Sequence, residues 1–426
     1  MSAMTETRVP DWVRMFAAAT PDAPAVTTAD ATISYGELDR RVAEAASGLT
    51  ARRVGPGSLV DVPAEPGADV VALLAAVPRV GATIHASGHD HPIPAAVPPD
   101  TYAIVATSGS AGRARSVILS HGNVIAAVGS SQARLGNDAS DRWLLCLPLT
   151  HVAGLFVAWR SFAAGGSMVV HRSFDAARVA ATLKHGDATF ASLVPTMLHR
   201  ILSSDSGPYQ GVRAVLLGGA PARADLVERA LDAGLPILQT YGMTETGSQI
   251  ATVEPGEARS ALGTAGRPLD GMVVTTDEGE ILVDGPAVSP GYLGEPRRTG
   301  PFRTGDLGHF DTAGRLVVVG RKGGVIITGG ENVHPAKVES ALESHPAVDV
   351  AVVFGVEEEE WGEVVAAVIS APVAAVASVA AHAERRLARH EMPKRWVAVD
   401  AMPLLANGKP DRAAAERLLR DVGSDG

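Results

Sequence analysis

The chain has 426 residues, of which 46% are hydrophobic and 20% charged, and its formal net charge is -10 at pH 7. This length predicts one large domain and one smaller domain, and the composition excludes a disordered or low-complexity chain. The negative charge excludes a general nucleic-acid binder, because neutralising phosphates needs a basic surface. The single cysteine, Cys146, excludes an internal disulfide framework and a cysteine-based zinc site, and it fits a cytoplasmic setting.

No segment predicts a secretory signal or a membrane span. Residues 1–16 contain no continuous apolar stretch. The most apolar stretch, 364–381, has Pro372 at its centre and serines at 370 and 378. We therefore interpret it as a strand, a turn and the start of a helix.

Strand-like apolar runs alternate with alanine-rich segments of helical length at 102–106, 167–171, 214–217 and 236–239. This alternation predicts an α/β fold, with layered and mainly parallel sheets, in a large N-terminal domain over residues 1–321. Short strands broken by Gly and Pro predict a small β-rich subdomain at about 271–320. A renewed pattern of strands and helices predicts a small α+β domain over 322–426.

The segment 107–112 reads TSGSAG, follows an apolar run and is followed closely by Arg115. Small residues let backbone N–H groups approach an anion, hydroxyl groups add donors and arginine adds charge, so the composition suits a polyphosphate. It is not the P-loop NTPase motif, which has Gly and Lys where this chain has Ala114 and Arg115. A flexible loop without a ligand explains the segment equally well. The candidate phosphate-binding residues are Thr107, Ser108, Gly109, Ser110, Ala111, Gly112 and Arg115.

Further motif-like segments follow in order along the chain. They are LPLTH at 147–151, GGAP at 218–221, YGMTE at 241–245, RTGD at 303–306, GRK at 320–322, GGEN at 329–332 and NGK at 407–409. Together with YAIVATSGSAGRARSVILSH at 102–121, they resemble the signature motifs of the superfamily of acyl-CoA synthetases, peptide-synthetase adenylation domains and luciferases. The resemblance implies an ATP- and Mg²⁺-dependent ligase. Such an enzyme forms acyl-AMP and pyrophosphate from a carboxylic acid, and then passes the acyl group to a thiol.

The resemblance assigns most of the nucleotide site. It implies that Tyr241 stacks on adenine, that Thr244 contacts phosphate and that Glu245 binds magnesium, whereas the residues alone favour a surface helix cap. It implies that Asp306 and Arg321 bind ribose, although a polar turn is the simpler interpretation of Asp306. The remaining nucleotide-binding candidates are Gly242 and Met243, with Gly218, Gly219, Ala220 and Pro221 as the adenine wall.

The resemblance also implies a mobile C-terminal domain. Lys409, otherwise a solvated turn residue, would bridge the substrate carboxylate and the α-phosphate, and the domain would turn about a hinge at Lys322. Gly329 and Gly330 would then line the path of the CoA pantetheine arm. His151, otherwise a packed neutral histidine, would be a positioning group between the acyl pocket and the thiol tunnel.

Two departures from the superfamily pattern stand out. In the phosphate loop, Ala114 replaces the usual Pro, Arg115 the usual Lys and Ser116 the usual Gly, and arginine keeps the charge but changes its geometry. The region between the helix around Ala75 and this loop is also much shorter than typical. We therefore expect some N-terminal elements to be missing.

Within the superfamily, segments 191–198, 239–250, 262–269 and 329–339 most resemble the o-succinylbenzoate–CoA ligases of menaquinone biosynthesis. That substrate has an aromatic ring and a second carboxylate, so its pocket needs donors, for which the candidates are Thr246, Ser248, Gln249 and Arg160. An ordinary surface position explains Arg160 equally well. Two alternatives stay open: a natural-product ligase that delivers another aryl or acyl acid to CoA or a carrier-protein thiol, and a catalytically weak nucleotide-binding pseudoenzyme. The sequence does not separate a monomer from a homodimer.

Overall fold

The computed structural model describes residues 8–87, 97–107, 115–358 and 361–423. Within them the largest sheet has mostly parallel strands, with antiparallel additions at both edges, as predicted. Its order is β13 (Arg267–Pro268), β12 (Ala251–Thr252), β11 (Ile237–Tyr241), β10 (Ala214–Leu217), β9 (Phe190–Leu193), β7 (Arg142–Leu145), β8 (Ser167–Val170), β1 (Pro24–Thr27) and β2 (Thr32–Ser34). The expected strands at 167–171, 214–217 and 236–239 are β8, β10 and β11.

Helices cover both faces of this sheet, which explains why its strands are almost continuously apolar. Leu144 packs in a cluster with α6 (Ala176–Lys184), α7 (Pro195–Ser204) and α8 (Ala224–Asp232). The next side chain on the strand, Leu145, joins the opposite cluster with α5 (Val152–Ala164). Trp143 lies on that face too, where its ring stacks on Phe190 with centroids 4.8 Å apart. The loops that follow these strands therefore begin at a tightly packed core.

A second sheet carries the candidate phosphate loop. It consists of β3 (Leu59–Asp61), β4 (Thr83–Ala86), β5 (Thr101–Thr107) and β6 (Arg115–Ser120). Helices α1 (Trp12–Ala19), α2 (Tyr35–Ala51) and α3 (Ala68–Arg79) precede or interleave its strands, and α4 (His121–Leu135) follows them. The loop joins antiparallel β5 and β6. Its residues Ser108, Gly109, Ser110, Ala111, Gly112 and Ala114 lie outside the described residues.

The third sheet is antiparallel and corresponds to the expected β-rich subdomain. Its strands are β14 (Val273–Asp277), β15 (Glu280–Asp284), β16 (Phe302–Phe310) and β17 (Leu316–Arg321). The prediction that Asp306 lies in a turn is wrong, because Asp306 lies inside β16 and pairs with Arg321 of β17. The misleading signal is Gly305, which has a φ of +72° and lies beside an irregularity in the ladder.

The small C-terminal domain has its own sheet and cores. The strands are β18 (Ile326–Thr328), β19 (Glu331–Val333), β20 (Val350–Glu358), β21 (Gly362–Ser370) and β22 (Arg395–Val399). Helices α9 (Pro335–Glu343) and α10 (Val376–Glu384) pack on one face, and α11 (Arg412–Gly423) packs on the other. The stretch 364–381 forms a strand and then a helix, as expected. Among the described residues, no helix is long and apolar enough to cross a membrane.

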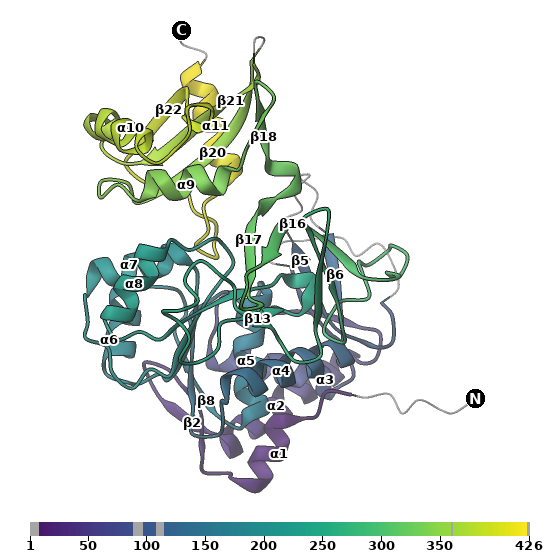
Figure 1. Cartoon of the computed structure of the whole chain (residues 1–426). Helices are drawn as coiled ribbons and strands as arrows, with labels where there is room; N and C mark the ends of the chain where they lie inside the picture. The colour runs from purple at the N-terminus through teal and green to yellow at the C-terminus, as the bar shows by residue number, and fades with distance from the viewer. Residues whose placement is uncertain (1–7, 88–96, 108–114, 359–360, 424–426) are drawn as a thin grey trace.

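The two domains meet above the carboxyl ends of the large sheet. In Figure 1, α9 lies over α7 and α8, and the loop before α11 reaches down to the large domain. The contacts there include an ion pair between His199 and Asp349 at 3.4 Å. The hydroxyl group of Thr196 also donates to the carbonyl of Gly408. This orientation places the loop that carries Lys409 against the large domain.

Candidate active site

The carboxyl ends of β9, β10 and β11 form one edge of the large sheet, which is where open α/β sheets bind ligands. The sequence Gly218-Gly219-Ala220-Pro221 follows β10, and Tyr241 ends β11. A 3-10 turn, η1 (Thr244–Thr246), comes directly after Gly242 and Met243. Gly242 is required sterically, because a Cβ there would lie 1.7 Å from the carbonyl oxygen of Ser248. The predicted nucleotide-binding residues at 218–221 and 241–245 therefore share one edge.

Tyr241, Asp306 and Arg321 form a connected group, although they come from three strands. The Tyr241 hydroxyl group donates to Asp306 Oδ2 at 2.6 Å, and Arg321 Nη1 donates to Asp306 Oδ1 at 2.9 Å. Burial, followed by the Asp306 charge, raises the pKa of Tyr241, so this phenol stays a donor. Tyr241, Asp306 and Arg321 therefore place an aromatic ring, a carboxylate and a guanidinium group next to one another.

Glu245 is held at one of its two oxygen atoms. Tyr292, which the sequence did not single out, donates its hydroxyl group to Glu245 Oε1 at 2.8 Å. The described residues contain no group of three or more His, Cys, Asp or Glu side chains that would hold a metal alone. Magnesium commonly takes one or two protein carboxylates together with substrate phosphates and water, so a single fixed carboxylate fits it.

Lys409 lies against the glycine turn of the large domain. A Cβ on Gly219 would come within 2.9 Å of Lys409 Cε and 3.2 Å of Nζ, so this glycine makes room for the lysine. Burial, followed by the charge of Arg321, lowers the pKa of Lys409. No acidic side chain in the described part of the chain pairs with it. A partly buried ammonium group without a counter-ion favours binding of an anion.

His151 occupies the N-cap position of α5, where its side chain makes no capping hydrogen bond. Burial first, and the nearby Lys409 charge second, lower the pKa of His151. The imidazole is therefore neutral near pH 7. A neutral imidazole suits a group that positions the substrate better than a group that supplies a positive charge.

Arg160 lies on the same helix and is only 2% exposed. Its guanidinium group donates to Ser248 Oγ at 3.3 Å and lies over the rings of Phe156 and Trp143, at 5.3 and 5.9 Å from their centroids. Its Nε has no partner, and no carboxylate in the described residues pairs with it. Burial lowers its pKa to about 9, so the group still carries its charge at neutral pH.

The other two donor candidates are engaged elsewhere. Thr246 Oγ1 accepts from the N–H of Met243 and donates to the carbonyl of Met243, both at 3.1 Å. The Gln249 amide accepts from Ser131 and donates to Thr252 inside the core. Neither side chain has a free polar group to offer, so the structure leaves Ser248 and Arg160.

Three predicted residues of the thiol step lie away from this edge. Gly329 and Gly330 form the turn between β18 and β19, where a Cβ on Gly329 would lie 2.7 Å from the Trp361 ring. Lys322, in η2 (Lys322–Gly324), extends back to the β-rich subdomain, and its Nζ pairs with Glu280 at 3.0 Å.

Comparison with known proteins decides the family. Residues 13–93 and 85–293 match the AMP-binding enzyme family, and residues 337–409 match the AMP-binding enzyme C-terminal domain. The chain belongs to the AMP-binding enzyme family. Its reaction class is that of an AMP-forming acid–CoA ligase, as the motifs predicted.

Several relatives of this AMP-binding enzyme are named 2-succinylbenzoate–CoA ligase. This chain is 37% identical over 343 residues to the 2-succinylbenzoate–CoA ligase of Bacillus subtilis (strain 168), covering 76% of this chain and 69% of the relative. It is 40% identical over 338 residues to the 2-succinylbenzoate–CoA ligase of Geobacillus kaustophilus (strain HTA426), covering 74% and 67%. The structure of the Bacillus subtilis o-succinylbenzoate CoA synthetase with its acyl-adenylate intermediate matches with a TM-score of 0.85 and 30% identity, over 95% of this chain and 97% of that chain.

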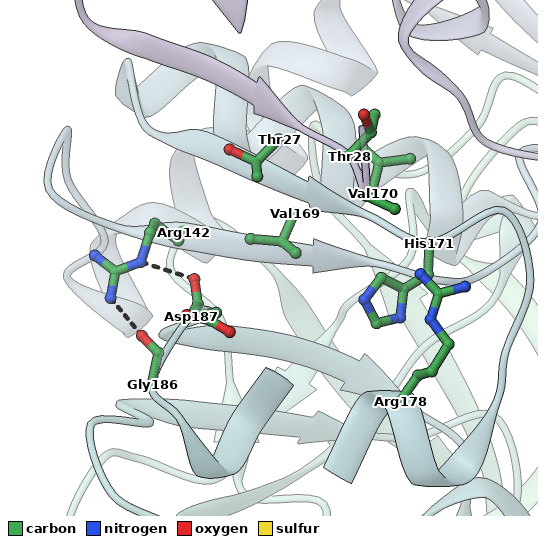
Figure 2. A pocket seen from close by; sticks show the side chains of 10 residues that line it. Thr27, Thr28, Arg142, Val169, Val170, His171, Arg178, Gly186 and Asp187 are labelled. Atoms are coloured by element: carbon green, nitrogen blue, oxygen red, sulfur yellow. Dashed lines mark hydrogen bonds between the residues drawn. The ribbon is translucent and has the colours of Figure 1, made fainter. Parts of the chain in front are cut away.

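A surface pocket of this AMP-binding enzyme lies elsewhere. It measures 410 Å³ and is lined by residues of β1, β8 and the segments around α6, among them Arg142, His171 and Arg178 (Figure 2). It shares no residue with the group around Tyr241 and Lys409. Arg142 already donates to the carbonyls of Gly186 and Asp187, and the unpartnered Nδ1 of His171 is buried out of reach of solvent. The pocket therefore does not compete with the sheet edge as the candidate active site.

Proposed function

We propose that this enzyme joins 2-succinylbenzoate to CoA at the cost of ATP, a step of menaquinone biosynthesis. The observation that carries the choice of acid is the buried Arg160 guanidinium, which has no carboxylate partner within residues 8–87, 97–107, 115–358 and 361–423. A buried charge is costly unless it is paired, so a protein retains one where a ligand supplies the opposite charge. The named relatives act on an acid with two carboxylates, of which the reaction consumes one.

The arrangement suits such an acid at both ends. Arg160 and Ser248 offer donors to the carboxylate that does not react, and the rings of Phe156 and Trp143 offer apolar surface near the same point. His151 begins the helix that carries Arg160, and Lys409 lies beside it. We assign the reacting carboxylate to the part of the site beside Lys409.

The nucleotide roles follow the geometry of the sheet edge. We assign the adenine to Tyr241 and the 218–221 turn, the ribose hydroxyl groups to Asp306 with Arg321, and the phosphates to Thr244 and the Thr107–Arg115 region. Glu245 would hold Mg²⁺, which screens the charge of the triphosphate when bound. Asp306 is 13% exposed in its side chain and already oriented by two donors, so it would meet a ribose without rearrangement.

The first half-reaction then requires little chemistry from the protein. A carboxylate oxygen attacks the α-phosphorus of ATP, the bond to the bridging oxygen breaks, and pyrophosphate leaves with its electron pair. Lys409, between His151 and Gly219, would hold both the carboxylate and the α-phosphate, and its ammonium group would stabilise the charge that gathers there.

The second half-reaction needs another arrangement of the small domain. The CoA thiol attacks the acyl carbon and AMP leaves, but Lys409 and its loop fill this side of the site. We propose a domain boundary at 321/322 and a turn about Lys322 that withdraws Lys409 and brings Gly329 and Gly330 to the pantetheine path. A cytoplasmic location is part of the same proposal, since Cys146 is a free, buried thiol.

The lowered pKa of Lys409 predicts a difference in pH dependence between the half-reactions. The lysine acts as a cation, so adenylation should fall as pH rises through the lowered pKa, below the ordinary lysine value of 10.5. Thioester formation from preformed acyl-adenylate should show no such loss. Single-turnover rates of both half-reactions, from neutral pH to about pH 10, measure this. An adenylation rate that stays constant over this range would contradict the role of the Lys409 charge.

Product analysis tests the proposed reaction. Purified protein with ATP, MgCl₂, CoA and 2-succinylbenzoate should release AMP and pyrophosphate and form one 2-succinylbenzoyl-CoA per AMP. The adenylate could form without acylation of CoA, while a phosphopantetheinyl carrier protein becomes acylated. This result would show that the acyl acceptor is a carrier protein and not CoA. Absence of both products would reject the proposal.

A further inference from the structure

Tyr292 lies between the two charged side chains expected at the phosphate end of the site. Its hydroxyl group donates to Glu245 Oε1 at 2.8 Å. The face of its ring lies against the Arg115 guanidinium, whose carbon is 3.3 Å from the ring centroid. Arg115 in turn pairs with Glu295 at 2.9 and 3.2 Å. One aromatic side chain therefore contacts both the carboxylate and the cation.

The backbone around Tyr292 fixes this position. Val117 of β6 forms a β-bridge with Tyr292, the N–H of Leu293 donates to Ser116 at 2.8 Å, and the N–H of Ile118 donates to Gly291 at 3.0 Å. On the other side, the N–H of Ser289 donates to the Glu245 carbonyl at 2.8 Å. The short segment 289–293 therefore connects β6 to the η1 turn, which are far apart in the sequence.

We propose that Tyr292 is a positioning residue for both charges. Its hydroxyl group orients Glu245 toward Mg²⁺, and its ring supports the Arg115 guanidinium beside the triphosphate site. This rests on the proposed function only for ATP and Mg²⁺ binding, not for the identity of the acid. It also explains the departure at position 115, because a planar guanidinium can stack flat on a ring and donate two N–H groups to one carboxylate, whereas an ammonium group has no plane to stack.

Two substitutions separate the two contacts. Tyr292→Phe removes the hydrogen bond to Glu245 and keeps the ring under Arg115. Hydrogen bonds to metal-binding carboxylates commonly change metal affinity by about tenfold or more. Glu295→Gln removes the charge that competes with ATP for Arg115, and leaves the Tyr292 hydrogen bond intact. The Arg115–Glu295 pair is 44% and 49% exposed, so the effect of its loss should be small.

ATP binding measured by calorimetry, without any carboxylic acid, tests this without turnover. We expect Tyr292→Phe to raise the Mg²⁺ concentration for half-maximal tightening of ATP binding about tenfold, and to leave metal-free ATP binding unchanged. Glu295→Gln should leave the Mg²⁺ titration unchanged and tighten ATP binding roughly two- to threefold. In a Glu245→Gln background, Tyr292→Phe should have no further effect, because it acts through that carboxylate.

An unchanged Mg²⁺ titration in Tyr292→Phe, or an equal loss of metal-free and metal-dependent binding, would overturn the proposal. If Tyr292→Phe does not fold, Tyr292→His keeps an aromatic ring but is too short to reach Glu245, and takes its place. A wild-type protein that binds Mg²⁺ and ATP but does not activate 2-succinylbenzoate would reject the choice of acid and leave this inference standing.

Discussion

Replacing Lys409 by alanine will slow acyl-adenylate formation by on the order of a hundred- to a thousand-fold, the usual cost of losing one preorganised charge at a reacting centre. The ammonium group lies against Gly219 and near His151, and no carboxylate among the described residues pairs with it. The neighbouring cation, Arg321, is held by Asp306 and so does not replace it. Thioester formation from synthetic acyl-adenylate and CoA should stay within about twofold, because the proposed turn of the small domain withdraws the lysine before the thiol attacks. Rapid-quench measurement of both half-reactions gives the two rates.

The control for Lys409 is Lys184→Ala. Lys184 pairs with Asp205 at 2.8 Å on the surface and lies outside the candidate site, so its loss should change neither half-reaction. Equal losses in both half-reactions of Lys409→Ala would indicate general damage to the site. Full retention of adenylation would show that Lys409 is an ordinary turn residue.

Replacing Arg160 by methionine will remove the preference for a dicarboxylic acid and stabilise the free protein. Losing a partner of a buried charge costs roughly 2–5 kcal/mol, so kcat/KM for 2-succinylbenzoate should fall by on the order of a hundredfold. Activity with benzoate, which has no second carboxylate, should not fall. The Tm should rise by a few degrees, because an unpaired buried cation gives way to an apolar side chain of similar length.

Arg178→Met provides the matched control, since it makes the same chemical change at an exposed position of α6. It should alter neither selectivity nor Tm. A lower Tm together with equal losses for both acids would show that Arg160 serves the fold. An unchanged ratio between the two acids would remove Arg160 from the substrate pocket.

The parts of the fold that were predicted are those with a strong local signal. Apolar runs bounded by Gly or Pro marked β8, β10 and β11. Asp306 was misplaced because Gly305 resembles a turn signal, whereas the partner that makes it a strand residue, Arg321, lies on another strand. β22 was missed for a similar reason, since its pairing with β21 is a long-range contact.

Local sequence signals also revealed only part of the candidate site. Tyr241, Glu245 and Lys409 were found through motifs, and Arg160 was named because a second carboxylate on the substrate needs donors. The burial of Arg160, which decides between substrate donor and surface residue, is a tertiary property. Tyr292 gave no signal, because an aromatic residue among glycines and prolines reads as packing. Long-range contacts, among them the bridge to Val117 and the hydrogen bond from Ser289 to the Glu245 carbonyl, bring its hydroxyl group to Glu245.

We propose that this enzyme adenylates an acid with a second carboxylate. ATP–pyrophosphate exchange without CoA, measured with 2-succinylbenzoate, benzoate and a medium-chain fatty acid at equal concentrations, tests it most directly. The buried Arg160 predicts that exchange with 2-succinylbenzoate exceeds that with either monocarboxylic acid by at least about tenfold. Clear preference for benzoate or the fatty acid would contradict the claim.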